Sequence, residues 1–278
     1  MAPIPLTKQA IVVIVMAACA AAAEVRAQGS PAAKEEAALI VVWKVHLENT
    51  NDHAKVLAAC EDFRKKSTNS VFRPVCDGLA AWHALQINEP AAAVSLLEPM
   101  LKSQGDALGK VVNTMAKRWL TRLDREKVKL ALKRLYRQNI EFPPSLDAMK
   151  SLPEADQGPF VDRWKQTWIY RLAEFKSPQF KNLRGQKYEL QSAALKTDSD
   201  LAAALKAPYA ARLSLKPSKL LSASPGKETV EFVTSDENPK KVILTAGTES
   251  EGMSFPFAGT GMLILSDGDY WAILPRPR

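Results

Sequence analysis

The sequence has little of what enzymes and metal-binding proteins commonly use for their chemistry. Among 278 residues there are three histidines, and His46, His53 and His83 all fall in expected helices, where a histidine is usually an ordinary core or surface residue. No His-Glu-x-x-His, Gly-x-Ser-x-Gly or Cys-x-x-Cys pattern occurs. Gly259-Thr260-Gly261 precedes an expected strand instead of a helix, so it is not a phosphate-binding loop. We therefore expect no enzymatic activity, no cofactor and no catalytic residue.

Long hydrophobic runs are also scarce, and the clearest one stands at the N-terminus. Ala10 to Ala23 are all apolar or small, which is short for a membrane span, and Val25-Arg26-Ala27 follows as a small-x-small cleavage site. We predict a signal peptide over residues 1–27 and therefore an exported protein, periplasmic or in the cell envelope. The alternatives are lipid attachment at Cys19, which would tether the protein to the membrane, and an uncleaved anchor.

The overall composition is that of an ordinary globular protein, with 46% hydrophobic and 24% charged residues and a formal net charge of +8. The positive charge is concentrated between Lys110 and Lys187. A basic region of this kind can attract nucleic acid or anionic lipid. For an exported protein, a solvated basic face is the simpler interpretation and an acidic protein partner the next. We expect no nucleic-acid partner.

Two cysteines follow the predicted signal peptide, Cys60 and Cys76. They lie in two expected helices, residues 51–66 and 71–86, which are joined by a short polar turn. In an antiparallel hairpin the two cysteines would stand at similar heights, and an oxidising compartment permits a disulfide between them. The alternative is two separate buried thiols that pack as small hydrophobic groups.

Residues 34–104 read as helical hairpins, because apolar residues recur at helical spacing and Pro90 suits the first turn of a new helix. Small and large residues in part of this region follow the spacing of a tetratricopeptide unit: Ala81, Ala84, Asn88, Ala93, Leu97 and Met100. From Gly105 a basic helical segment continues with a shift of its apolar phase near Asp124, so either one long helix bends there or two helices meet. Pro143-Pro144 ends it.

The pattern changes to strands after Trp164. Trp168 to Leu172 and Lys187 to Gln191 are short and aromatic, and residues 208–278 alternate between short apolar segments and turn residues such as Asp267-Gly268. We predict an α+β chain with three domains after the signal peptide: helical hairpins over 34–104, a helix on a small antiparallel sheet over 105–206, and a small antiparallel β module over 208–278.

Three patterns occur in order within the middle domain. They are Phe142-Pro143-Pro144-Ser145-Leu146, then Asp162-Arg163-Trp164-Lys165-Gln166-Thr167-Trp168-Ile169-Tyr170, then Tyr188-Glu189-Leu190-Gln191-Ser192. Together with the preceding helix, residues 127–200 resemble the globular domain of type II secretion major pseudopilins, with Tyr-Pro-x-x-Leu, Asp-Pro-Trp-Gly-Asn-Pro-Tyr-x-Tyr and Tyr-Asp-Leu-x-Ser in the same order.

The resemblance implies a helix lying across a small antiparallel sheet. Asp162 would cap the turn into the first strand, Trp164 would pack beneath the helix, and Trp168, Tyr170 and Tyr188 would be fold determinants on the sheet. It also implies a calcium loop after the second strand, for which Asp198 and Asp200 are the candidate ligands.

This sequence departs from the family pattern in three respects. The prepilin motif that opens the family's assembly helix does not occur, so self-assembly through such a helix is not expected. Lys165, Gln166 and Thr167 replace the family's Gly, Asn and Pro. The glycines of the calcium loop are missing, and a calcium ion needs six or more oxygen ligands, so we expect no bound metal.

The sequence thus favours an exported, non-enzymatic protein–protein interaction or assembly module, such as an adaptor of a secretion or pilus-like machine, with envelope proteins as its partners. The alternative is a stand-alone envelope protein that reuses the fold to bind an anionic polymer or glycan.

Overall fold

The structure is a computed structural model that describes residues 31–176, 184–207, 209, 215–224, 226–235, 238–250 and 252–277. The predicted signal peptide, including Cys19, lies outside the described residues. The chain divides into two compact units: unit 1 includes the residues up to Ala116 and from Tyr209 onward, and unit 2 comprises Lys117–Ala207. Helices dominate the first half of the sequence and antiparallel strands the second, so the predicted α+β class is confirmed.

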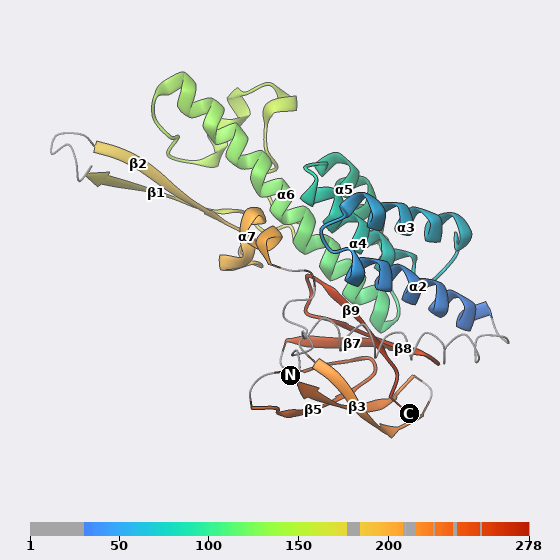
Figure 1. Cartoon of the computed structure of the whole chain (residues 1–278). Coiled ribbons are helices and arrows are strands. Elements are labelled where there is room, and N and C mark those ends of the chain that lie inside the picture. The colour runs from blue at the N-terminus through green and yellow to red at the C-terminus, as the bar shows by residue number, and fades with distance from the viewer. Residues whose placement is uncertain are drawn as a thin grey trace, which may run out of the picture. The chain divides into compact units, whose positions relative to one another are not determined.

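Unit 1 begins with antiparallel helical hairpins (Figure 1). Its helices are α2 (Pro31–Glu48), α3 (His53–Lys66), α4 (Arg73–Gln86), α5 (Pro90–Leu97) and the 3-10 turn η1 (Pro99–Lys102). The bounds of α3 and α4 agree with the sequence-based prediction to within two residues. Asp52 caps α3 by accepting a hydrogen bond from the backbone N–H of Lys55, and Pro90 opens α5 as expected. No described helix combines the length and the apolar character that a membrane crossing requires.

Unit 1 is completed by two antiparallel sheets near the C-terminus. One sheet has the order β3-β4-β5 and the other β6-β7-β8-β9. The strands are β3 (Leu215–Ser222), β4 (Thr229–Thr234), β5 (Lys241–Thr245), β6 (Thr248–Ser250), β7 (Met253–Ala258), β8 (Met262–Ser266) and β9 (Trp271–Pro275). The turn between β8 and β9 contains Gly268 with a φ of 88°, the positive angle for which Asp-Gly is favoured.

Glu36 joins the helices of unit 1 to its sheets. This buried side chain in α2 accepts hydrogen bonds from the backbone N–H groups of Thr260 and Gly261, at 3.2 and 2.9 Å, in the turn between β7 and β8. Phe72, ahead of α4, packs edge-on against Phe257 of β7, with ring centroids 4.9 Å apart. The structure therefore differs from the sequence-based division, which separated residues 34–104 from 208–278, because both segments contribute to one buried interior.

Unit 2 is an insertion between the two segments of unit 1. Helix α6 (Ala107–Asn139) is one continuous helix of 33 residues that starts in unit 1 and continues into unit 2, so the predicted phase shift marks neither a break nor a second helix. After two 3-10 turns, η2 (Leu146–Ser151) and η3 (Glu154–Asp156), the antiparallel hairpin β1 (Ile169–Lys176) and β2 (Arg184–Gln191) follows. The unit ends with η4 (Lys196–Ser199) and α7 (Leu201–Lys206).

Candidate functional site

The carboxylate of Asp162 fixes the turn that leads into β1. Asp162 is buried, and its Oδ1 accepts hydrogen bonds from the backbone N–H groups of Trp164 and Gln166 at 2.8 and 3.0 Å. A bridge between Val161 and Thr167 closes the base of this turn. The predicted capping role of Asp162 is therefore confirmed. Two backbone N–H groups of the turn donate to this one charged acceptor, so the conformation of the turn depends strongly on the Asp162 side chain.

The second oxygen of Asp162 connects this turn to the end of β2. Its Oδ2 accepts a hydrogen bond of 2.6 Å from the hydroxyl of Ser192, which is also buried. The same hydroxyl accepts from the backbone N–H groups of Ala194 and Leu195 at 3.1 and 3.3 Å. Asp162 in the second sequence pattern and Ser192 in the third thus form one buried polar network, in which each oxygen has a partner.

Lys165 occupies the turn with a φ of 65°, in the left-handed region that favours glycine. The resemblance places a glycine of the pseudopilin pattern at this position. The turn therefore has the conformation for which glycine is suited, although this chain carries a lysine there, and the lysine side chain remains exposed.

The first sequence pattern meets the other two through its backbone and its ring. The hydroxyl of Tyr170 donates to the carbonyl of Pro143 at 2.8 Å, and the backbone N–H of Phe142 donates to the side chain of Gln186 at 2.8 Å. The Phe142 ring lies 4.7 Å from that of Tyr188 in an edge-on arrangement. Burial raises the pKa of Tyr170 to about 12 and also raises the pKa of Tyr188, so both phenols keep their protons at neutral pH.

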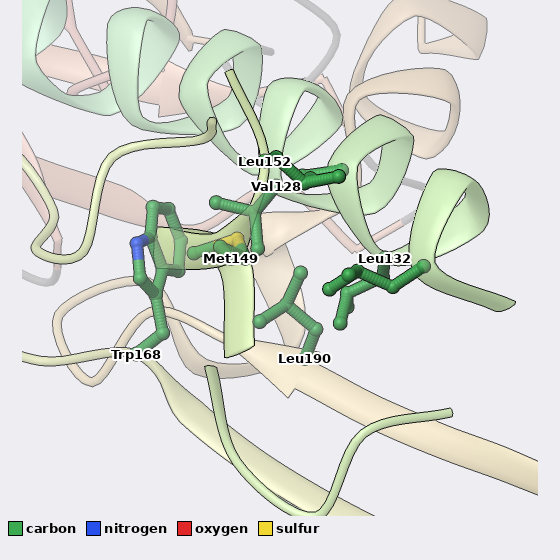
Figure 2. Close-up of a cluster of buried hydrophobic side chains, with 8 residues drawn as sticks. Val128, Leu132, Met149, Leu152, Trp168 and Leu190 are labelled. Atoms are coloured by element: carbon green, nitrogen blue, oxygen red, sulfur yellow. The ribbon is translucent and has the colours of Figure 1, made fainter. Parts of the chain in front are cut away.

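Trp168 is the tryptophan that packs beneath α6. It belongs to a buried cluster with α6 residues such as Val128 and Leu132, with Met149 and Leu152, and with Leu190 of β2 (Figure 2). Its indole N–H donates to the carbonyl of Pro159 at 2.7 Å, which satisfies the one polar atom of the ring.

Trp164 was predicted to lie beneath α6, and the structure corrects this. Trp164 is only partly buried and does not belong to the cluster, whose tryptophan is Trp168. Trp164 lies inside the tight turn that Asp162 holds, whereas Trp168, directly before β1, packs in the cluster beneath the helix. Gly158 allows the close approach, because a Cβ there would lie 2.6 Å from the Cα of Val128.

A series of arginines on α6 binds the end of β2 and the segment that follows it. Arg122 and Arg125 donate through Nε to the carbonyls of Asp198 and Leu190, each at 2.8 Å. Arg118 lies 3.6 Å from the carboxylate of Asp198, and Arg125 lies 3.1 Å from that of Asp200. The spacing of four and three residues puts these arginines on one face of the helix. Positive charge is thus supplied to the segment by the protein itself.

Asp198 and Asp200, the two candidate calcium ligands, already bind groups of the protein itself. Asp200 caps α7 by accepting from the backbone N–H of Ala203 at 2.8 Å, and this hydrogen bond, together with those from Arg125, lowers the pKa of Asp200. Asp198 is paired with Arg118. Within the described ranges no three His, Cys, Asp or Glu side chains are grouped so that they could hold a metal ion.

Cys60 and Cys76 lie close together in unit 1, in α3 and α4. Both are buried and free in the structure, and the Cys76 Sγ lies 3.6 Å from the backbone carbonyl of Cys60. The hydrogen bond with Cys60, and after it burial, raise the pKa of the Cys76 thiol, so it is a poor nucleophile at neutral pH. The structure thus has the two buried thiols that were the alternative to the bridge. An intact mass of the protein purified without reductant tests the disulfide, because a bridge removes two hydrogens.

The three histidines form a hydrogen-bonded chain that single-sequence reasoning missed. His46 Nδ1 lies 3.0 Å from His83 Nε2, and His83 Nδ1 lies 2.9 Å from His53 Nδ1. His46 and His83 are buried, and their pKa values fall to about 4 and about 3, mainly because of burial and also because of repulsion from the neighbouring imidazoles. His46 and His53 stand on either side of the α2–α3 turn, but the meeting with His83 depends on how the helices pack.

No family model, curated protein or solved structure matches the chain significantly.

Proposed function

We propose that this chain is an exported, non-enzymatic interaction module whose unit 2 is similar in plan to the globular domain of type II secretion major pseudopilins. It would serve as an adaptor in a secretion or pilus-like machine. The observation that carries this proposal is that the three sequence patterns meet in one place. Asp162 binds Ser192, and Tyr170 binds the carbonyl of Pro143. The residues that resemble the family are thus the ones that hold the unit together.

The charge distribution supports an interaction module over a polyanion-binding protein. Much of the basic excess of unit 2 is bound internally, since Arg118, Arg122, Arg125, Arg134 and Arg163 all contact acidic side chains or carbonyls. Cations engaged in this way contribute less to the attraction of an anionic polymer.

The alternative, an envelope protein that binds an anionic polymer or glycan, depends on the remaining cations. It predicts binding to a soluble polyanion that weakens steeply as salt is added, because such binding releases counterions and is screened. An interaction module with a specific protein partner is expected to bind the polyanion weakly if at all.

The proposal is tested by purifying a C-terminally tagged full chain from envelope fractions and identifying what purifies with it. We expect components of a secretion or surface-assembly machine. Trp168→Ala, which empties the core of unit 2, should lose them, whereas Val41→Asn, at an exposed position of α2 in unit 1, should retain them. Recovery of the chain without such components would contradict the proposal.

A further inference from the structure

The outer face of α6 carries a line of residues that the core of unit 2 does not use. Leu130, Lys133 and Arg137 follow one another at intervals of three and four positions, so they share one face of α6, and Ile140 comes directly after the last residue of the helix. We call these four residues the outer seam. The buried residues of the same stretch occupy the opposite side of the helix: Val128, Ala131, Leu132 and Leu135.

The two apolar members of the outer seam are largely exposed. Leu130 is 58% exposed and Ile140 is 77% exposed. Tyr136, on the same stretch of α6, is 39% exposed, and its ring packs against that of Phe142 with centroids 4.6 Å apart. One exposed aliphatic side chain is ordinary, but apolar residues repeated along one helix face are typical of a face that binds a partner.

Isoleucine is an unfavourable residue at position 140, both for the backbone conformation and for its exposure to solvent. Ile140 follows Asn139, the last residue of α6, with a φ of 60°, and its N–H donates to the carbonyl of Tyr136 at 2.7 Å. This left-handed position after a helix favours glycine or asparagine, and a β-branched residue there is a rare and strained choice. The chain thus has an isoleucine where both the backbone and the solvent disfavour it. A packing partner for the side chain would explain this choice.

The charged members of the outer seam are not neutralised by unit 2. Neighbouring cations of α6 are neutralised, since Lys129 pairs with Glu126 at 2.8 Å and Arg134 pairs with Asp156 at 2.6 Å. Within the part of the chain that the structure describes, no carboxylate lies within ion-pair distance of Lys133 or Arg137. The seam therefore has an apolar residue at each end and two uncompensated positive charges in the middle.

We propose that the outer seam of α6 docks an amphipathic helix of a partner protein in which apolar residues flank carboxylates. The inference rests on the proposed function and names the kind of partner. The order apolar–basic–basic–apolar along the seam is complementary to a helix that carries acidic residues between two apolar ones. The seam runs from Leu130 to Ile140, about 15 Å along the helix direction, which corresponds to about three turns of a partner helix.

A membrane surface fits the seam less well than a helix does. Helices that lie in a membrane interface have a broad apolar face on one side and their cations on the other. Here the broad apolar face of α6 is buried in unit 2, and the cations lie in the same narrow line as the exposed Leu130 and Ile140.

The test uses the full chain and a synthetic helical peptide of about three heptads, in which two glutamates lie between two leucines along one face. We expect the peptide to bind at low salt, as measured by fluorescence anisotropy. Lys133→Glu combined with Arg137→Glu should weaken binding by about tenfold or more, since each lost charge pair becomes a repulsion. Ile140→Asn should weaken binding and at the same time raise the thermal midpoint of the protein, because asparagine tolerates the left-handed backbone. This opposite movement of affinity and stability is not expected if Ile140 has a structural role alone.

Matched controls lie outside the seam. Val41→Asn changes an exposed aliphatic residue of α2, and Lys102→Glu reverses an exposed charge at the end of η1, so neither should affect peptide binding. The inference is overturned if the peptide does not bind, if a version with lysine in place of glutamate binds equally well, or if anionic vesicles bind more tightly and the seam variants abolish that binding. If envelope partners still purify with the seam variants, the inference fails while the proposed function stands.

Discussion

The hydroxyl of Ser192 donates a 2.6 Å hydrogen bond to the carboxylate of Asp162, thirty positions earlier in the chain, and both side chains are buried. This contact closes unit 2. It connects the turn before β1 to the turn after β2, and the two strands of the hairpin lie between those ends.

The first prediction concerns this pair. Asp162→Ala removes a buried charged acceptor and leaves two backbone N–H groups and the buried Ser192 hydroxyl without it, so we expect a loss of about 3 kcal/mol in the free energy of unfolding of unit 2. Ser192→Ala should cost about 1–2 kcal/mol. Because the two residues share a hydrogen bond, the double variant should lose about 1 kcal/mol less than the sum. Urea unfolding of the four proteins measures this coupling, and strict additivity would contradict the network. Asp147→Ala, at an exposed ion pair, is the control and should change stability by less than about 0.5 kcal/mol.

The second prediction concerns the left-handed residue of the same turn. Lys165→Gly removes the steric cost of a positive φ, about 1–2 kcal/mol, against an entropic cost of about 0.5–1 kcal/mol for glycine in the unfolded chain. We expect a net gain of about 0.5–1 kcal/mol by difference. Lys165→Val, which adds a branch at Cβ, should destabilise the protein. A loss of stability with glycine, measured by thermal unfolding, would mean that the turn has a different conformation.

The third prediction is a dependence of the stability of unit 1 on pH. The pKa values of His46 and His83 in the folded state, about 4 and about 3, lie below the unfolded value near 6.5. The unfolded state therefore binds more protons once the pH falls below about 6.5, and stability should decrease from there down to the folded pKa values. The slope contributed by each histidine approaches about 1.4 kcal/mol per pH unit.

Among the described residues, the titratable groups in ring contact with these two imidazoles are one another, His53 and the buried Tyr209, whose ring lies 5.3 Å from that of His46. The comparison that isolates them is His83→Asn against the unchanged protein, because carboxylates titrate in both below pH 5. The variant should show a shallower loss of stability between pH 6.5 and 4. Parallel curves would show that the histidine chain does not control the response.

The fourth prediction tests whether arginine side chains or a calcium ion neutralise the aspartates in the segment after β2. Because Arg118 and Arg125 already bind the carboxylates of Asp198 and Asp200, adding calcium or a chelator should leave the unfolding midpoint unchanged. Arg125→Ala should cost about 2–3 kcal/mol, since it leaves the Leu190 carbonyl and the Asp200 carboxylate without their charged donor. A rise in the midpoint with calcium would identify a metal site instead.

Much of the fold was predictable from the sequence, because it depends on local patterns. Helical spacing located α3 and α4 to within two residues, and short apolar segments between turn residues predicted the antiparallel strands of residues 208–278. Strand β3 has the weaker pattern, because it contains Pro217, and the structure has a register shift between Pro217 and Lys219. The joining of the helical and β segments into unit 1 was missed. It depends on contacts such as Glu36 with Thr260, which are far apart in sequence.

The site was predictable only where a residue acts on its own turn. Asp162 was identified correctly because its side chain binds donors two and four residues ahead. Trp164 was wrongly placed beneath α6, where the structure has Trp168, because two tryptophans four residues apart look equivalent until the conformation of the turn is known. The arginine series and the histidine chain were not anticipated, since their partners come from elements 30 to 76 positions away.

The most direct measurement is the location of the tagged full chain in intact cells, together with the proteins that purify with it. If the chain is an exported interaction module, it should be recovered from the envelope fraction in complex with components of a secretion or surface-assembly machine. Recovery from the cytoplasm, or from the envelope without such components, would contradict this function.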